Sequence, residues 1–232
     1  MSTIQDNIAR VKETMEKAAR KAGRKPHEIQ LIAVSKTHPA ERIQTAHETG
    51  QIHFGENRVQ EAETKIETLS HLDLQWHLIG HLQTNKAKKA ATLFSWIHSV
   101  DSPRLAKALE KEAAKLDRSV NILLQVNIAE EEQKFGAAID DFETLLNTVK
   151  ESPHLTCHGL MIIPPFFDSA EESRGYFKAL RELGEKYTTD LVPKGKQLEL
   201  SMGMSHDFPV AIEEGATMVR VGTAIFGMRH YC

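Results

Sequence analysis

The chain has 232 residues, of which 41% are hydrophobic, and its 29 Lys and Arg against 32 Asp and Glu give a formal net charge of −3. This length and apolar content are enough for one buried core and predict a single domain over residues 1–232. The charge excludes the basic excess that is typical of nucleic-acid-binding proteins, and no run approaches the roughly 20 apolar residues that cross a membrane.

The two cysteines, Cys157 and Cys232, form neither a disulfide framework nor a metal-ligand pair. The amino-terminal stretch is charged and amphipathic and lacks the apolar region of a signal peptide. We therefore expect a soluble cytoplasmic protein with no metal site, no nucleic-acid partner and no membrane partner.

A helix is predicted from about residue 3 to residue 22, and apolar strand-like runs then alternate with amphipathic helical stretches such as 103–116. The runs cover residues 29–36, 52–57, 74–80, 94–100, 121–128, 155–163, 197–204 and 217–227. Strands joined by crossover helices must pair in parallel, which predicts an α/β fold. Eight such units indicate a (β/α)8 TIM barrel with an extra amino-terminal helix. An open doubly wound sheet is the alternative, disfavoured because no Gly-x-Gly-x-x-Gly follows the first strand.

Lys36 ends the first apolar run and is followed by Thr37, His38 and Pro39. Burial at a strand tip disfavours the ammonium form of lysine, and the neutral amine is the form that condenses with an aldehyde to give a Schiff base. The alternative is a lysine whose head simply reaches water.

The last two runs end in residues that suit a phosphate, because hydroxyls and closely approachable backbone amides bind anions. These residues are Ser201, Gly203, Gly222 and Thr223. In a barrel the carboxyl ends of all strands meet at one mouth, so polar residues near those ends should face a common space. They are Lys36, Asn57, His77, Asn127, Ser201 and Arg220.

An amine and an anion cradle at one mouth would together bind a phosphate-bearing aldehyde, and pyridoxal 5'-phosphate is such a cofactor. Arg220, on the last strand, could then reach the ring nitrogen of a cofactor held at the first strand. The alternative for Arg220 is a structural salt bridge at the mouth.

Five sequence blocks together carry a family resemblance: AVSKTHPAERI at 33–43, HFGENRVQEA at 53–62, WHLIGHLQTNK at 76–86, LSMGMSHD at 200–207 and TMVRVGTAIFG at 217–227. In this order and spacing they closely resemble the YggS/PROSC family of pyridoxal phosphate homeostasis proteins, over essentially the whole chain. One departure is His81, where the family often has a proline.

The resemblance implies a single barrel of fold type III, similar to the amino-terminal domain of alanine racemases, with pyridoxal phosphate covalently bound to Lys36 as a Schiff base. It implies that Ser201, Gly203, Gly222 and Thr223 hold the phosphate and that Arg220 contacts the pyridine nitrogen. Asn57 and His77 belong to blocks that line the same mouth.

The expected function is intracellular pyridoxal phosphate homeostasis without appreciable catalysis, by a monomer that meets apo-enzymes transiently. The alternative is a small racemase or lyase, which would need a second acid/base group opposite the lysine. The three tyrosines, Tyr176, Tyr187 and Tyr231, fall in helices or at the chain end and are poor candidates for that group. A more distant alternative is a Schiff-base aldolase without a cofactor. Lys134, in the loop after the fifth strand, remains open as a second site of aldehyde capture.

Overall fold

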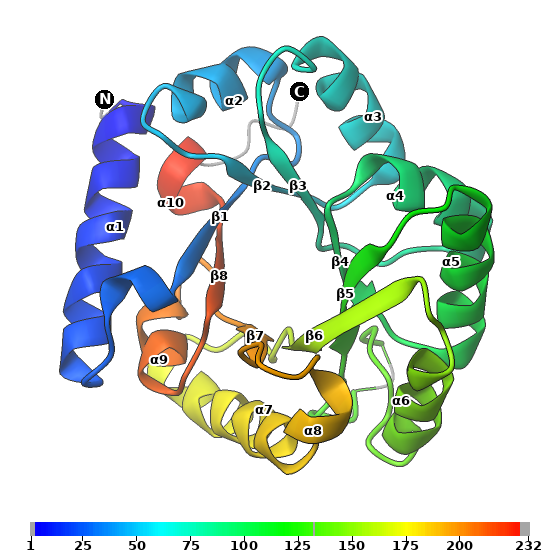
Figure 1. The fold of residues 1–232 in the computed structure, drawn as a ribbon. Helices are drawn as coiled ribbons and strands as arrows, with labels where there is room; N and C mark the ends of the chain where they lie inside the picture. The colour runs from blue at the N-terminus through cyan, green and yellow to red at the C-terminus, as the bar shows by residue number, and fades with distance from the viewer. Residues whose placement is uncertain (1–2, 132, 228–232) are drawn as a thin grey trace.

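The computed structural model describes residues 3–131 and 133–227. Eight parallel strands form a closed barrel in sequence order, and β8 pairs with β1 to complete it (Figure 1). The strands are β1 (Gln30–Val34), β2 (His53–Glu56), β3 (Gln75–Leu78), β4 (Trp96–Val100), β5 (Val120–Gln125), β6 (Leu155–Met161), β7 (Glu199–Ser201) and β8 (Met218–Val221). The predicted (β/α)8 barrel is confirmed.

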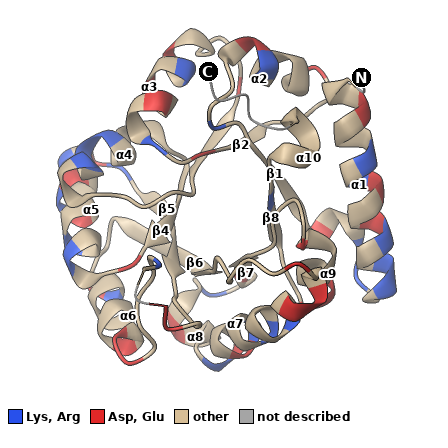
Figure 2. Cartoon of the chain, turned by 180° about the vertical axis from the view of Figure 1, so that it is seen from behind, with Lys and Arg blue, Asp and Glu red and all other residues tan. Residues whose placement is uncertain are grey.

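Helices surround the barrel on its outer side (Figure 1). The α-helices are α1 (Ile4–Lys21), α2 (Ala40–His47), α3 (Val59–Thr68), α4 (Ala87–Leu93), α5 (Pro103–Lys115), α6 (Phe142–Lys150), α7 (Arg174–Lys186), α8 (Thr188–Leu191), α9 (Phe208–Glu213) and α10 (Thr223–Phe226). Short 3-10 helices cover Pro26–Glu28, Thr84–Lys86 and Ala170–Ser173. Basic and acidic residues are interspersed on the outer helices, whereas the strands carry few charged residues (Figure 2).

The predicted amino-terminal helix is α1. Thr3 caps it, because its hydroxyl accepts a hydrogen bond from the amide of Asp6 while the Asp6 carboxylate accepts one from the amide of Thr3. Apolar residues on one face of α1 are buried, and α1 packs against α9 and α10, the helices that precede and follow β8 in the chain (Figure 1). The helix thus covers the part of the barrel where the first and last strands meet.

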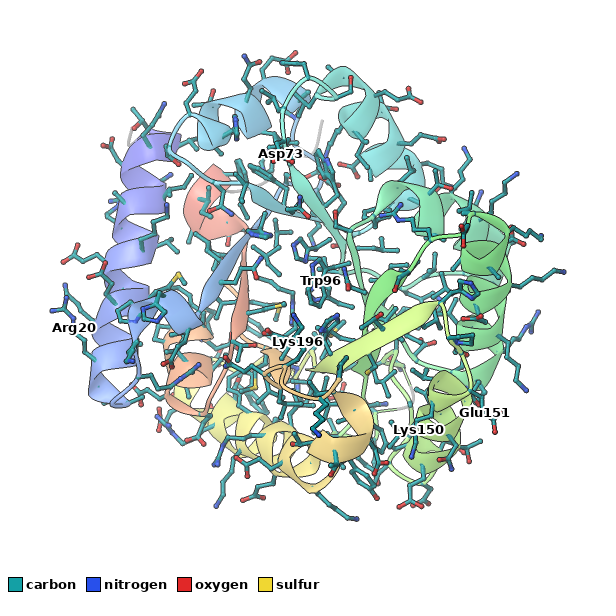
Figure 3. The ribbon with its side chains drawn as sticks, viewed as in Figure 1. Arg20, Asp73, Trp96, Lys150, Glu151 and Lys196 are labelled. Atoms are coloured by element: carbon teal, nitrogen blue, oxygen red, sulfur yellow. The ribbon has the colours of Figure 1, made fainter. Side chains whose placement is uncertain are left out.

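Two layers of apolar side chains hold the barrel. The larger layer lies between strands and helices and includes fully buried residues such as Phe54, Ile97 and Leu124. A smaller cluster fills the barrel interior, and Trp96 packs against it from β4 (Figure 3). The interior cluster consists of Ile32, Leu123, Met161 and Met218. Because side chains alternate along a strand, the residues two positions from these also face the interior.

The structure shortens several predicted strands. The first ends at Val34, so Lys36 lies in the following turn rather than in the strand. The last ends at Val221, and residues 223–226 of the predicted run 217–227 form helix α10 instead. Continuous apolar character does not distinguish a buried strand from a buried helical turn, which explains the overlong run.

Some sequence features lie away from the mouth or outside the described chain. Cys157 is buried, and burial raises the pKa of its thiol to about 12. Cys232 and Tyr231 lie outside the described residues. No helix in the described part of the chain is long and apolar enough to cross a membrane, and within residues 3–131 and 133–227 no group of three His, Cys, Asp or Glu is arranged to hold a metal ion.

Candidate cofactor site

Lys36 lies in a tight turn at the carboxyl end of β1 and is half-buried. The amide of Ser35 donates to the carbonyl of Gly55 at 3.0 Å, which continues the sheet to the residue before the lysine. Thr37, immediately after it, has a φ of 66°. A threonine in this left-handed region costs about 1–2 kcal/mol, so the surrounding contacts must hold the turn.

A buried ion cluster between strand β2 and helix α3 supplies those contacts. The Lys65 ammonium on α3 donates to the Ser35 carbonyl at 2.8 Å, to Glu56 Oε1 at 2.7 Å and to Glu61 Oε1 at 2.6 Å. Glu61 Oε1 in turn accepts the amide of Thr37 at 2.5 Å. Both residues that flank Lys36 are therefore fixed through the one ammonium group of Lys65.

Glu56 is fully buried in this cluster, and its Oε1 also accepts the Ser35 hydroxyl at 2.6 Å. Burial raises the pKa of the Glu56 carboxyl, and the neighbouring Lys65 opposes that rise. The cluster was not predicted. A glutamate ending a buried run and the Glu61–Lys65 spacing of four residues on a helix were the signals that could have found it.

A pair of backbone amides converges at the end of β8. The amides of Gly222 and Ala224 donate to the Ser205 hydroxyl at 3.1 and 3.4 Å. A Cβ on Gly222 would lie 3.3 Å from the Cβ and the carbonyl oxygen of Val34, so this turn approaches the end of β1 closely. The amide pair therefore lies beside the strand that leads to Lys36.

The other predicted phosphate residues have different surroundings. Thr223 is exposed as the first residue of α10. Gly203 has a φ of 88°, and a Cβ there would come within 2.6 Å of the Ala211 Cβ and 2.9 Å of the Phe208 Cα on α9. Glycine at 203 is thus required by the path of the chain against α9, whatever its contact with a ligand.

Ser201 and Arg220 point into the barrel and contact each other. Arg220 Nη1 donates to Ser201 Oγ at 2.6 Å, and Nη2 donates to the Ile162 carbonyl at 2.8 Å. Burial lowers the pKa of the Arg220 guanidinium to about 10, with Asp207 opposing the change. Arg220 therefore remains a cation at neutral pH. The alternative expected from the sequence was a structural salt bridge, but among the described residues the two hydrogen-bond acceptors of Arg220 are neutral.

The three asparagine and histidine candidates differ in position. Asn57 follows β2, and its buried Oδ1 has no hydrogen-bond partner among the described residues. Asn127 donates to the carbonyl of Glu131 at 2.9 Å and so fixes its own loop. His77 is fully buried inside the barrel, where its Nε2 contacts His53 and its Nδ1 contacts His98.

Sequence reasoning missed Ser205, His53 and His98. Ser205 stands in the LSMGMSHD block, and a hydroxyl four residues after Ser201 was a usable signal. His53 and His98 each lie at an inward position of a predicted strand, in phase with their interior neighbours, but nothing in the sequence pairs them.

Two loops flank the mouth. His81 Nδ1 lies 3.3 Å from Asp101 Oδ2, and its ring stacks on Phe135 with centroids 3.8 Å apart. These contacts define the conformation of the loop in which His81 departs from the family pattern. Lys134, in the loop of Phe135, pairs with Glu131 at 3.1 Å.

These residues fit pyridoxal phosphate. An anion could take the place of the Ser205 hydroxyl on two convergent amides, and the orphaned Asn57 Oδ1 offers an acceptor at the same end of the barrel. Lys36 provides the amine one strand away from Arg220, since Ile32 on β1 is registered with Arg220 on β8.

Comparison with known proteins gives the family. Residues 2–230 match the sequence profile of the alanine racemase amino-terminal domain. The chain belongs to this family. Within it, the chain is 44% identical over 232 residues to a pyridoxal phosphate homeostasis protein of Pseudomonas aeruginosa, covering 100% of this chain and 98% of the relative. It is 43% identical to the Aquifex aeolicus protein of the same description over 229 residues, with 97% and 98% covered.

Solved structures agree with the fold. PipY of Synechococcus elongatus PCC7942 with pyridoxal phosphate bound superposes with a TM-score of 0.81 at 44% identity, covering 92% of this chain and 100% of PipY. Alanine racemase of Corynebacterium glutamicum gives a TM-score of 0.67 at 16% identity, covering 97% of this chain and 63% of the racemase. The second likeness concerns the barrel alone.

Proposed function

We propose that this chain binds pyridoxal phosphate through a covalent link to Lys36 and serves in homeostasis of the cofactor, without appreciable catalysis of its own. The observation that carries the proposal is the close approach of the Gly222 turn to Val34. It sets an amide pair suited to phosphate beside the strand that ends next to Lys36. The homeostasis proteins at 43–44% identity and PipY with its cofactor support it.

Each part of the mouth has a role in this proposal. Gly222, with Ser201, Gly203 and Thr223, holds the phosphate. Arg220 contacts the ring nitrogen, and Asn57 and His77 complete the surroundings of the cofactor. When bound, pyridoxal phosphate supplies an aldehyde and an electron-withdrawing ring.

Arg220 favours holding the cofactor over catalysis. A guanidinium only donates hydrogen bonds, and at neutral pH Arg220 is charged, so a ring nitrogen beside it stays unprotonated. An unprotonated ring withdraws electrons more weakly, which disfavours most amino-acid chemistry of this cofactor while leaving its attachment intact.

The described tyrosines also support a holder, because neither lies at the carboxyl end of a strand: Tyr176 lies on α7 and Tyr187 ends that helix. The ring of Tyr176 stacks on Phe167, and the Tyr187 hydroxyl donates to Glu143. The proposal includes one domain over residues 1–232, acting as a cytoplasmic monomer that meets apo-enzymes transiently. A small racemase or lyase is the second candidate. It would be established if the protein loaded with pyridoxal phosphate turned over any one of a panel of amino acids.

Borohydride reduction tests the central link. We expect reduction of the loaded protein to fix one pyridoxyl group on Lys36, located by peptide mass mapping, because the turn of Lys36 stands beside the amide pair. The Lys36→Ala variant should lose the label and the visible absorption band. Label found only on Lys134 would refute the assignment, and label on both lysines would add a second capture site. Lys134→Ala serves as the matched control.

Removal of the Ser201 hydroxyl tests the phosphate assignment. The Ser201→Ala variant should weaken pyridoxal phosphate binding by about 1.5–3 kcal/mol, the size of a hydrogen bond to a charged acceptor. Binding of unphosphorylated pyridoxal should weaken less, because that ligand loses only the support that Ser201 gives to Arg220 and no phosphate contact, as measured by titration of both ligands. Equal losses for the two ligands would place the phosphate elsewhere.

A further inference from the structure

A chain of hydrogen-bonded side chains crosses the barrel interior. His53 Nδ1 lies 3.0 Å from His77 Nε2, and His77 Nδ1 lies 2.9 Å from His98 Nε2. His98 Nδ1 lies 2.9 Å from Ser201 Oγ, which accepts Arg220 Nη1 at 2.6 Å. The chain runs from β2 through β3 and β4 to β7 and β8, and so links the amino end of one strand to the candidate cofactor site.

Burial favours the neutral form of all three rings. His77 and His98 are fully buried, and burial lowers the pKa of each imidazole well below its ordinary value. Burial also lowers the pKa of His53, which is half-buried. A neutral imidazole has one donor and one acceptor nitrogen. Three such rings in a row must therefore all donate in the same direction.

Ser201 determines that direction. Arg220 can only donate, so one lone pair of Ser201 Oγ accepts its N–H. If the Ser201 hydroxyl donates its hydrogen bond to His98 Nδ1, every ring carries its own proton on Nε2. If the Ser201 hydroxyl donates its hydrogen bond to another acceptor, His98 Nδ1–H donates to Ser201 Oγ and every ring carries its own proton on Nδ1.

We propose that His98, hydrogen-bonded through His77 to His53, positions the hydroxyl of Ser201. In this proposal, a phosphate that accepts a hydrogen bond from that hydroxyl reverses the direction in which the three histidines donate. This inference rests on the proposed role of Ser201 in phosphate binding. With phosphate bound, Ser201 makes three hydrogen bonds, two accepted from Arg220 and His98 and one donated to the ligand.

The reversal conserves protons. Ser201 Oγ passes its proton to His98 Nδ1 and takes up another from the mouth, the Nε2 protons of His98 and His77 each move to the next ring, and the Nε2 proton of His53 leaves to solvent. His53 lines a surface pocket with Lys12, Glu16 and Gln30 at the amino ends of β1 and β2. Occupancy of the mouth thus changes the hydrogen-bonding character of a surface group at the opposite end of the barrel.

Nitrogen-15 NMR of protein labelled at histidine tests the inference, because Nδ1–H and Nε2–H tautomers have distinct two-bond correlation patterns. In the ligand-free protein we expect Nε2–H for all three rings. Pyridoxal phosphate should convert all three to Nδ1–H, while unphosphorylated pyridoxal should leave them unchanged. His158 is the control within the same spectrum. It lies 2.9 Å from Asn121 Oδ1, does not belong to the row of three histidines, and should not change.

Two substitutions of His98 separate positioning from mere packing. In His98→Asn the amide occupies the place of Nδ1 and still reaches Ser201, whereas in His98→Gln it occupies the place of Nε2 and reaches His77 instead. The asparagine variant should bind pyridoxal phosphate about 3- to 10-fold more tightly than the glutamine variant, the effect of one hydrogen bond. Equal affinities would overturn the positioning role of His98.

Other outcomes are equally decisive. Mixed tautomers among the three rings of the ligand-free protein would overturn the single direction of the chain. Cofactor fixed on Lys36 by borohydride with no change at His53, His77 and His98 would overturn the reversal and leave the proposed function standing. Absence of any visible absorption band after adding pyridoxal phosphate would instead refute the proposed function, and the reversal with it.

Discussion

Replacing Lys65 by methionine should lower the free energy of unfolding by about 3–5 kcal/mol, the cost of removing one partner from a buried ion pair. Lys65 lies 2.7 Å from the fully buried Glu56 and also bonds the Ser35 carbonyl. Its loss leaves the Glu56 carboxylate without a cation and releases the turn that holds Lys36. Denaturant unfolding measures the first effect, and titration with pyridoxal phosphate measures the second.

The pH dependence of this variant has a defined sign. The pKa of Glu56 is raised above 4.5 in the folded protein, and without Lys65 it should rise further. The folded state then binds more protons than the unfolded state, so stability is retained below the ordinary carboxyl pKa and lost as pH rises through the folded pKa. The deficit of Lys65→Met should therefore shrink as pH falls from neutral towards 4.5.

Lys89→Met is the matched control. Lys89 pairs with Glu63 at 2.6 Å but is 50% exposed. Exposed pairs contribute about 0–1 kcal/mol, so this variant should be nearly as stable as the parent at every pH. Equal losses for Lys65→Met and Lys89→Met would show that the buried cluster does not stabilise the fold.

The second large effect is expected for Gly203→Ala, which should cost about 2–5 kcal/mol of stability. The left-handed φ of 88° disfavours any side chain, and the added methyl would meet Ala211 and Phe208 at 2.6 and 2.9 Å. The loop that joins Ser201 to Ser205 must shift to relieve the overlap. Pyridoxal phosphate affinity should therefore fall together with the unfolding free energy.

Gly195→Ala separates the two causes. Gly195 has a similar φ of 82°, but nothing lies within 4 Å of the position that an added methyl would take. It should lose only the conformational part, about 1–2 kcal/mol, without a change in cofactor binding. If the two alanine variants were equally stable, overlap with α9 would not be the reason for glycine at 203.

The positions of the main elements could be predicted from the sequence. Helical and strand periodicity are local properties, so the amino-terminal helix at 4–21 and the eight alternating runs were visible in the chain itself. Parallel pairing followed because helices separate the strands. Since the carboxyl ends of barrel strands share one mouth, the order of the strands was enough to predict that Lys36, Ser201, Arg220 and Gly222 lie near one another.

Element ends were less accurate for a local reason as well. The residues 223–226 are apolar enough to extend a strand, yet they form a helical turn because the chain leaves the barrel at Gly222. That exit depends on where β8 stops pairing with β1, at Val221. Register across the closure of the barrel is a property of two segments nearly 190 residues apart, as the pairing of Ala33 with Val221 shows.

The sequence by itself determined the order of the β-α units, the amine at Lys36 and the small polar residues near the ends of the last two strands. Only the tertiary structure decided which buried polar groups meet: Lys65 with Glu56, and His98 with Ser201, which is 103 residues away. The physical reason is that buried polar atoms must find partners, and closure of the barrel decides which inward and outward positions come within hydrogen-bond distance.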